Sequence, residues 1–291
     1  ELGGSTIYQN REFNKIENQS SSDWLKKEIK ELKNIKNLEI KTRTSVAAFH
    51  GYNYLLAREN LTDHLEKKDK LEKIRQRLLK IRAKKVILAT GALERPLIFN
   101  NNDRPGIMLS SAIKKYADFY GVISGKKNVF FTNNDSAYES AFCLHNKGIK
   151  VEAIIDIRES SNSMIVKAVE EAGIKIHWSH TIVDTSGYKR LNGISAMKLS
   201  NDGLSVTGKK INISCDCLGV AGGWTPAVHL FTQSGGKLKF DENDKIFLPN
   251  KYPSEQLSVG SCNGDFKLKE IINNLSINLK QFLKVNETDF D

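Results

Sequence analysis

The chain has 291 residues, of which 40% are hydrophobic and 27% charged, a balance that is ordinary for a globular protein. This length accommodates one large domain or two modest ones. Its 44 lysines and arginines outnumber 34 acidic residues, for a net charge of +10, so nucleic-acid binding has to be considered. The lysines are scattered, however, and no aromatic residues alternate with them as on a base-stacking surface. The pattern therefore disfavours a nucleic-acid binder.

The chain opens on Glu1-Leu2-Gly3-Gly4, without a methionine or a basic and apolar leader. We read this opening as the middle of a fold and expect a fragment. No apolar stretch approaches the roughly 20 residues that cross a bilayer. The cysteines form no CxxC pair, which excludes a dithiol centre or a four-cysteine zinc site and favours the cytoplasm. No metal is expected, since His177 and His180, three apart in a predicted strand, would point to opposite faces.

Hydrophobic periodicity predicts the elements in chain order. Helices are predicted at 21–36, 110–120, 136–147, 163–172 and 267–283. Strands are predicted at 38–49, 52–59, 77–91, 127–132, 151–156, 174–182, 217–226 and 256–264. The connection 60–76 fits either a charged loop or a helix. Turns at Asn192-Gly193 and Asp202-Gly203 indicate an antiparallel meander.

Two apolar strands end on glycine, VILATG at 86–91 and CLGVAGG at 217–223, and such ends let a bound nucleotide approach the backbone. A βαβ unit and the meander lie between them. This order of elements along the chain predicts an α/β fold of two nested Rossmann-like domains of the FAD/NAD(P)-binding type, with a β-meander. The first domain would be discontinuous, 1–108 and 225–291, and the inserted domain would be 109–224. No GxGxxG occurs in the sequence, so the first phosphate-binding loop is missing.

Four segments carry a resemblance to a known family: TGALERPLIFNNNDRPGIMLSSA (90–112), FFTNNDSAYESAF (130–142), VAGGWTPAVHLFTQSGGKL (220–238) and VGSCNG (259–264). They resemble the alpha subunits of heterotetrameric sarcosine oxidases. Opine oxidase and hydrogen cyanide synthase subunits are broader relatives. The resemblance covers essentially the whole chain, whereas the family's phosphate loop and C-terminal folate-binding domain lie outside it.

The resemblance implies an oxidoreductase subunit that is inactive alone and binds NAD noncovalently. FAD would be carried by a partner beta subunit, with FMN near the subunit boundary, and smaller gamma and delta subunits would complete the complex. The complex would oxidise sarcosine to glycine and pass the one-carbon unit to tetrahydrofolate through the missing C-terminal domain. Oxygen would be reduced to peroxide.

The resemblance also implies cofactor-binding residues. Gly3, Gly4 and Ser5 would lie beside the adenosine part of NAD, and Val46 would frame the adenine. Ala89, Thr90 and Gly91 would pass near the cofactor, and Cys262 and Leu268 would belong to a third contact region. An ordinary turn at Gly3–Ser5 and a buried strand valine at position 46 are the alternative interpretations. No catalytic residue is expected in this chain.

The loop of the inserted βαβ unit, residues 133–138 (NNDSAY), contains no glycine. Asp135 and Glu139 place negative charge where a phosphate would lie, and Ser136 and Glu139 have capping-box spacing. We therefore expect a poor NAD(P)H site here. A self-sufficient FAD/NAD(P)H-dependent oxidoreductase, which would need this loop, and a basic binding module are the alternatives. The charged cluster around Glu94 and Arg95 is expected to be solvated or locally paired.

Overall fold

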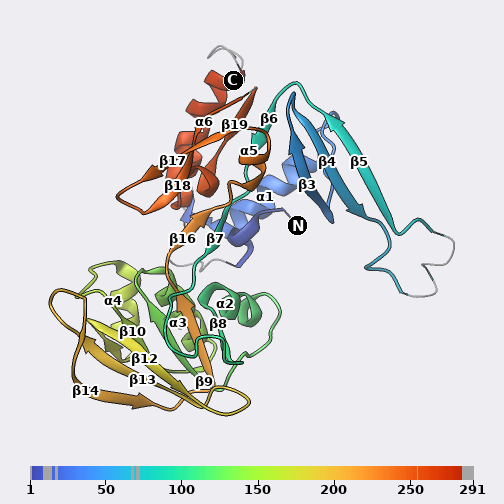
Figure 1. Cartoon of the computed structure of the whole chain (residues 1–291). Helices are drawn as coiled ribbons and strands as arrows, with labels where there is room; N and C mark the ends of the chain where they lie inside the picture. Colours follow the sequence, from blue (N-terminus) through green and yellow to red (C-terminus); the bar gives the residue numbers. More distant parts are fainter. Residues whose placement is uncertain are drawn as a thin grey trace. The chain divides into compact units, whose positions relative to one another are not determined.

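The computed structural model describes residues 2–8, 15–16, 19–66, 69, 73–253 and 255–283. By its contacts the chain divides into unit 1, residues 1–4, 23–93 and 225–291, and unit 2, residues 5–22 and 94–224 (Figure 1). Residues 94–108, which the sequence assigned to the first domain, lie in unit 2. The crossings fall within β7 (Ala92–Glu94) and β16 (Trp224–Pro226), and these two strands pair with each other.

Unit 2 is built on a parallel five-stranded sheet of order β11-β10-β9-β15-β8. Its strands are β8 (Ile107–Leu109), β9 (Lys127–Thr132), β10 (Lys150–Asp156), β11 (Ile176–His177) and β15 (Cys217–Ala221). Strands β9 and β15 are almost entirely buried and read as continuous apolar runs, because a parallel sheet is covered on both faces.

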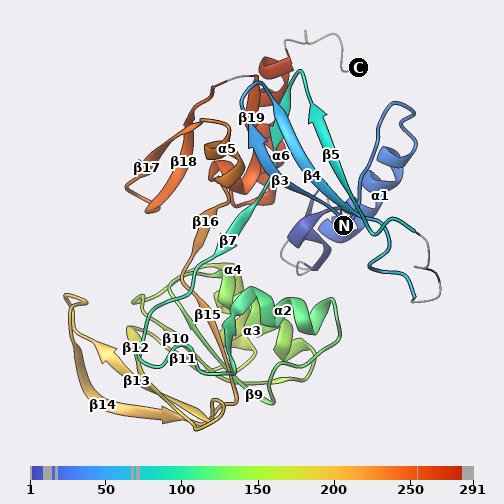
Figure 2. The same ribbon diagram turned by 45° about the vertical axis from the view of Figure 1, so that its right-hand side comes forward.

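Helices cover one face of this sheet and the meander covers the other (Figures 1 and 2). Phe130 of β9 packs among residues of α2 (Ser110–Asp118), α3 (Ser136–Asn146) and α4 (Met164–Glu171). Its neighbours Val129 and Phe131 pack on the opposite side with residues of the antiparallel sheet β12-β13-β14. Those strands are β12 (His180–Ser186), β13 (Gly193–Leu199) and β14 (Val206–Ile213). The alternation of side chains along a strand therefore divides the core into two layers.

The single strand predicted at 174–182 is wrong. The chain turns after β11, where Ser179 adopts φ +55°, and β12 then leaves to join the meander. Because of this turn, the rings of His177 and His180 lie 5.4 Å apart between centroids and do not point to opposite faces.

Unit 1 combines an antiparallel sheet, β3-β4-β5, with a parallel pair, β19-β6, and a hairpin, β17-β18. The strands are β3 (Thr44–His50), β4 (Tyr54–Asn60), β5 (Gln76–Arg82), β6 (Val86–Leu88), β17 (Lys237–Asp241), β18 (Ile246–Lys251) and β19 (Gln256–Ser258). Its helices are α1 (Ser21–Lys33), which begins in unit 2, α5 (His229–Gln233) and α6 (Leu268–Leu283). Short elements complete the described chain: 3-10 helices η1 (Gly4–Tyr8) and η3 (Gly260–Asn263), and strands β1 (Lys15–Ile16) and β2 (Gln19–Ser20).

The strand predicted at 77–91 is interrupted in unit 1. Strand β5 ends at Arg82, and β6 begins at Val86 and pairs in parallel with β19. The buried side chain of Asn53 holds the turn between them, because its amide donates to Lys84 O at 3.1 Å and to Glu255 O at 3.0 Å.

Other parts of unit 1 also differ from or add to the prediction. Residues 61–66 form turns rather than a helix, and residues 67–68 and 70–72 of the same connection lie outside the described part. The β17-β18 hairpin was not predicted. Within the described ranges, no helix is long and apolar enough to span a membrane.

Candidate functional site

The parallel sheet of unit 2 has a topological switch point between β9 and β15. From β9 the chain winds outward through β10 to β11, and it then returns to place β15 on the other side of β9. In doubly wound folds, ligands bind at the carboxyl ends of strands where the winding reverses. The loop of residues 133–136 after β9 and the end of β15 border this position.

Hydrogen bonds within the chain close this crevice. The carbonyl of Ala221, the last residue of β15, accepts from Thr132 Oγ1 at 3.2 Å and from Asn134 Nδ2 at 3.1 Å. Asn134 Oδ1 also accepts from the backbone N–H of Ser136 at 3.0 Å and from its hydroxyl at 2.6 Å. A helix-terminal N–H that could meet a phosphate is therefore already satisfied by an asparagine side chain.

A network of ion pairs made by Arg158 lies beside the loop. Arg158 contacts Asp135 at 2.8 Å and Asp156, the last residue of β10, at 2.8 Å. Asp156 is fully buried and also accepts from the Tyr138 hydroxyl at 2.7 Å. Burial and the Asp156 charge hold the pKa of Tyr138 far above its usual value. The acid at the end of the second strand, which in dinucleotide-binding domains faces the ribose, is thus engaged by this chain's own side chains.

The predicted capping box is wrong in its partners. The Ser136 hydroxyl donates to Asn134, and Glu139 pairs with the buried Lys114 of α2 at 3.0 Å. The sequence pattern gave the start of α3 but missed Asp156 and Arg158. An acidic residue at the end of the second strand of the βαβ unit was the available signal for this ion-pair network.

In unit 1, the structure brings four of the predicted site residues together at the carboxyl ends of β6 and β19. Ala89, Thr90 and Gly91 follow β6 directly, and the thiol of Cys262 donates to Leu88 O at 3.2 Å. Thr90 Oγ1 donates to Ala227 O at 2.7 Å.

Two features of this edge bear on ligand binding. Gly91 has φ +75°, and a Cβ added there would meet no atom within 4 Å. Ser258, the last residue of β19, has a buried hydroxyl without a hydrogen-bond partner among the described residues.

The remaining predicted residues lie on other elements, one of which, α6, packs against the 3-10 helix η3 that holds Cys262. Val46 lies on β3 next to a β-bulge and is 40% exposed, so the buried-valine alternative does not hold. Gly3 lies against Leu25 of α1, while Gly4 and Ser5 are the exposed first residues of the 3-10 helix η1. Leu268 is the first residue of α6.

No group of metal-ligating side chains is present among the described residues. The four cysteines are free thiols. Cys215 and Cys217 are buried, and burial is the main factor that raises the pKa of each thiol to about 12, which suits packing rather than redox chemistry.

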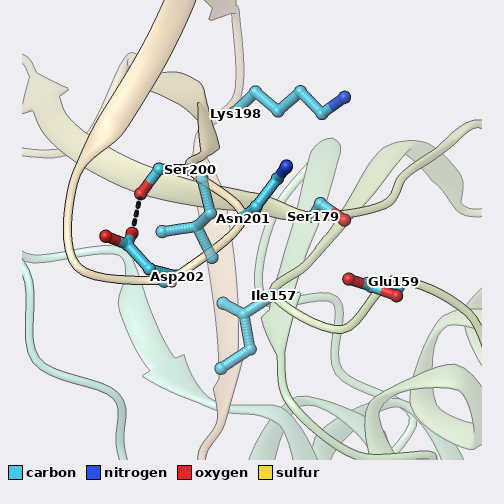
Figure 3. A pocket seen from close by; sticks show the side chains of 9 residues that line it. Ile157, Glu159, Ser179, Lys198, Ser200, Asn201 and Asp202 are labelled. Atoms are coloured by element: carbon cyan, nitrogen blue, oxygen red, sulfur yellow. Dashed lines mark hydrogen bonds between the residues drawn. The ribbon is translucent and has the colours of Figure 1, made fainter.

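A separate pocket in unit 2 is polar and lies under the β13–β14 turn (Figure 3). Glu159, Lys198 and Asn201 line it, and Asp202 is held by the Ser200 hydroxyl at 2.5 Å. The described lining presents no nucleophile paired with a base, so we assign it no chemistry.

No protein-family model matches the chain. Sarcosine oxidase subunit alpha of Corynebacterium sp. (strain P-1) is 35% identical over 268 residues, which cover 91% of this chain and 27% of that protein. The subunit of the same name from Rhizobium meliloti (strain 1021) is 32% identical over 236 residues, which cover 80% of this chain and 22% of that protein. The chain is a relative of the sarcosine oxidase alpha subunits. It spans about a quarter of their length.

Solved structures confirm the predicted fold class. Thioredoxin reductase of T. acidophilum matches with a TM-score of 0.66 at 15% identity, over 99% of this chain and 88% of that one. L-proline dehydrogenase of P. horikoshii matches with a TM-score of 0.60 at 21% identity, over 90% of this chain and 44% of that one. At these identities the likeness establishes a Rossmann-like α/β fold and no specific activity.

Proposed function

We propose that the chain is the NAD-binding part of an alpha-like subunit in a multi-subunit oxidoreductase of the sarcosine oxidase kind. The observation that carries this proposal is the 35% identity to a sarcosine oxidase alpha subunit over 91% of the chain. In the proposed complex, flavin chemistry resides on a partner beta subunit. Sarcosine is oxidised to glycine while oxygen is reduced to peroxide, and the one-carbon unit passes to tetrahydrofolate.

NAD is assigned to unit 1, at the carboxyl ends of β6 and β19. The open space at Gly91 and the unpartnered hydroxyl of Ser258 fit a ligand with ribose and phosphate groups. Ala89, Thr90 and Cys262 border the same edge, while Gly3, Gly4, Ser5, Val46 and Leu268 are proposed contacts on the resemblance alone. When bound, NAD supplies a nicotinamide ring that can accept or donate a hydride.

Unit 2 is not assigned a dinucleotide. Its crevice is crossed by the hydrogen bonds to Ala221 O, and its ribose-facing acid is held by Arg158 and Tyr138. A phosphate at the start of α3 would compete with the Asp135 carboxylate for Arg158, and like charges repel. In this proposal unit 2 is a structural domain.

The test is the cofactor content of the full-length protein that carries this chain. We expect a colourless subunit that releases NAD on denaturation. A flavin absorption band on this subunit alone would instead support the self-sufficient FAD/NAD(P)H-dependent oxidoreductase. Turnover of an opine rather than sarcosine by the reconstituted complex would support an opine oxidase-type subunit.

Matched glycine variants locate the NAD. Gly91 and Gly173 have φ of +75° and +74°, and both have open space at the Cβ position. Gly91→Val is expected to lower the amount of retained NAD at least tenfold, whereas Gly173→Val in unit 2 should leave it unchanged. Equal retention in both variants would contradict the assignment to unit 1.

A further inference from the structure

We propose that an aromatic patch on unit 2, formed by Tyr116, Phe119, Tyr120, Val122 and Ile123, is the docking surface for a partner subunit of the complex. This inference rests on the proposed function, because it names the surface through which such an alpha-like subunit contacts its partner.

The patch is solvent-exposed although its residues are large and apolar. The exposed fractions are 44% for Tyr116, 37% for Phe119, 57% for Tyr120, 48% for Val122 and 60% for Ile123. The buried residues of α2 are different ones, Ser110, Ile113, Lys114 and Ala117. The patch therefore does not serve the core of unit 2. A contiguous exposed apolar surface of this kind is typical of an interaction site.

Internal contacts hold the patch in one shape. The ring of Phe119 meets that of Tyr120 edge-on at 4.9 Å between centroids, and the rings of Tyr116 and Tyr120 lie 6.0 Å apart. Beyond the helix, Gly121 adopts φ +65° and the N–H of Val122 donates to Tyr116 O at 2.8 Å. A preformed surface loses little conformational entropy on binding, and tyrosines are enriched among the residues that dominate binding energy.

The surrounding charge identifies the kind of partner. Lys115 Nζ lies 6.0 Å from the centre of the Tyr120 ring, and the exposed Lys126 and Lys127 follow the patch in the chain. The acidic residue within the segment, Asp118, is already paired with Lys147 at 3.0 Å. Apart from the paired Asp118, the charged residues next to the patch in the chain are thus basic, and the chain has a net charge of +10, which disfavours a second copy and favours a partner that is apolar at its centre and acidic at its edge.

The test uses the full-length protein that carries this chain, purified together with the flavin-carrying beta-like subunit of the same organism. A double variant, Phe119→Ser with Tyr120→Glu, removes two rings and adds a negative charge to the patch. Tyr188→Glu is the matched control, because Tyr188 is 94% exposed and lies in another loop of the same unit. We expect the Kd for the beta-like subunit to rise at least tenfold in the double variant and to change less than twofold in the control.

Each result decides between interpretations. Circular dichroism that matches the parent protein establishes that the double variant is folded, since its altered residues lie at the surface. An unchanged Kd in the folded double variant overturns the patch as the docking surface and leaves the proposed function intact. If the parent protein instead forms a dimer that the double variant loses, the occupant is a second copy and the proposed partner is wrong. If the parent protein binds no beta-like subunit at all, the proposed function fails together with this inference.

Discussion

Glu94 differs from the expectation of a charge that is solvated or locally paired. It is only 9% exposed, and its Oε2 accepts from the backbone N–H of Ser111, at the start of α2, at 2.9 Å. Its Oε1 has no hydrogen-bond partner within the described ranges. Burial raises the pKa of Glu94, although the interaction with Ser111 opposes this shift.

The raised pKa of Glu94 determines the sign of a pH effect. The folded protein holds the proton more tightly than the unfolded chain, so its stability falls as the pH rises from the unfolded pKa to the folded one. Glu94→Gln keeps an oxygen acceptor for Ser111 and cannot ionise. We expect the variant to match the parent protein in urea unfolding at pH 4 and to be more stable than the parent at pH 7. A variant that is less stable at pH 7 would contradict this account.

A matched control separates the hydrogen bond at Glu94 from its charge. Glu94→Ala removes the acceptor for the Ser111 N–H, and loss of a helix-terminal cap costs about 1 kcal/mol. The alanine variant should therefore be less stable than the glutamine variant at both pH values.

The Arg158–Asp156 pair is a second residue-scale feature with a measurable consequence. Asp156 is fully buried, so removal of Arg158 leaves a buried charge without its ionic partner, which typically costs 3–5 kcal/mol. We expect Arg158→Met to lower the free energy of unfolding by about 3 kcal/mol. The double variant Arg158→Met, Asp156→Asn should recover part of that loss, and equal stability of the two variants would argue against the pair.

At the scale of elements, the core of unit 2 depends on close contact between β15 and its neighbours. A Cβ added at Gly219 would lie 2.6 Å from the Phe130 ring and 3.0 Å from Ile113. Overpacking of a core typically costs 1–3 kcal/mol, so Gly219→Ala should be destabilised by about that amount in denaturant unfolding. Gly51→Ala, where nothing lies within 4 Å and the φ is ordinary, should stay within about 0.5 kcal/mol of the parent protein.

Elements defined by interactions between residues close in the sequence were predicted well, and turns defined by distant partners were not. Helix α3 and strand β9 were predicted nearly to the residue, because their apolar patterns are local. The predicted strands 77–91 and 174–182 were each divided by a turn. Those turns depend on distant partners, such as Glu255 for Asn53 and Arg158 for the N–H of Ser179. Such partners are not encoded in a local pattern.

At the scale of the whole molecule, the proposed cofactor should couple to stability. A ligand that binds the folded state alone stabilises it by about 2.7 kcal/mol at 100 times its Kd. We therefore expect added NAD to raise the Tm of the NAD-depleted full-length protein. The Gly91→Val variant should lose this shift and Gly173→Val should keep it. An equal shift in both variants would place NAD elsewhere.

The net charge offers a whole-molecule test of the basic-module alternative. Electrostatic binding to a phosphate backbone weakens steeply as salt increases. If the chain is an enzyme subunit, it should show no salt-dependent retention on immobilised duplex or single-stranded DNA at moderate ionic strength. Strong retention at 50 mM salt that vanishes by 200 mM would revive the alternative.

The sequence by itself determined most of the order of elements, the two glycine-ended strands, the fold class and the kinship, because these depend on local patterns and residue identities. The tertiary structure decided which segments meet. It paired β6 with β19, some 170 positions apart by number, and so gathered Ala89–Gly91 and Cys262 at one edge. It also joined Asp135 to Asp156 through Arg158, and Asp156 to the hydroxyl of Tyr138. A strand's side-chain alternation fixes its faces but not its neighbours, and for that reason the closed crevice of unit 2 became visible only in three dimensions.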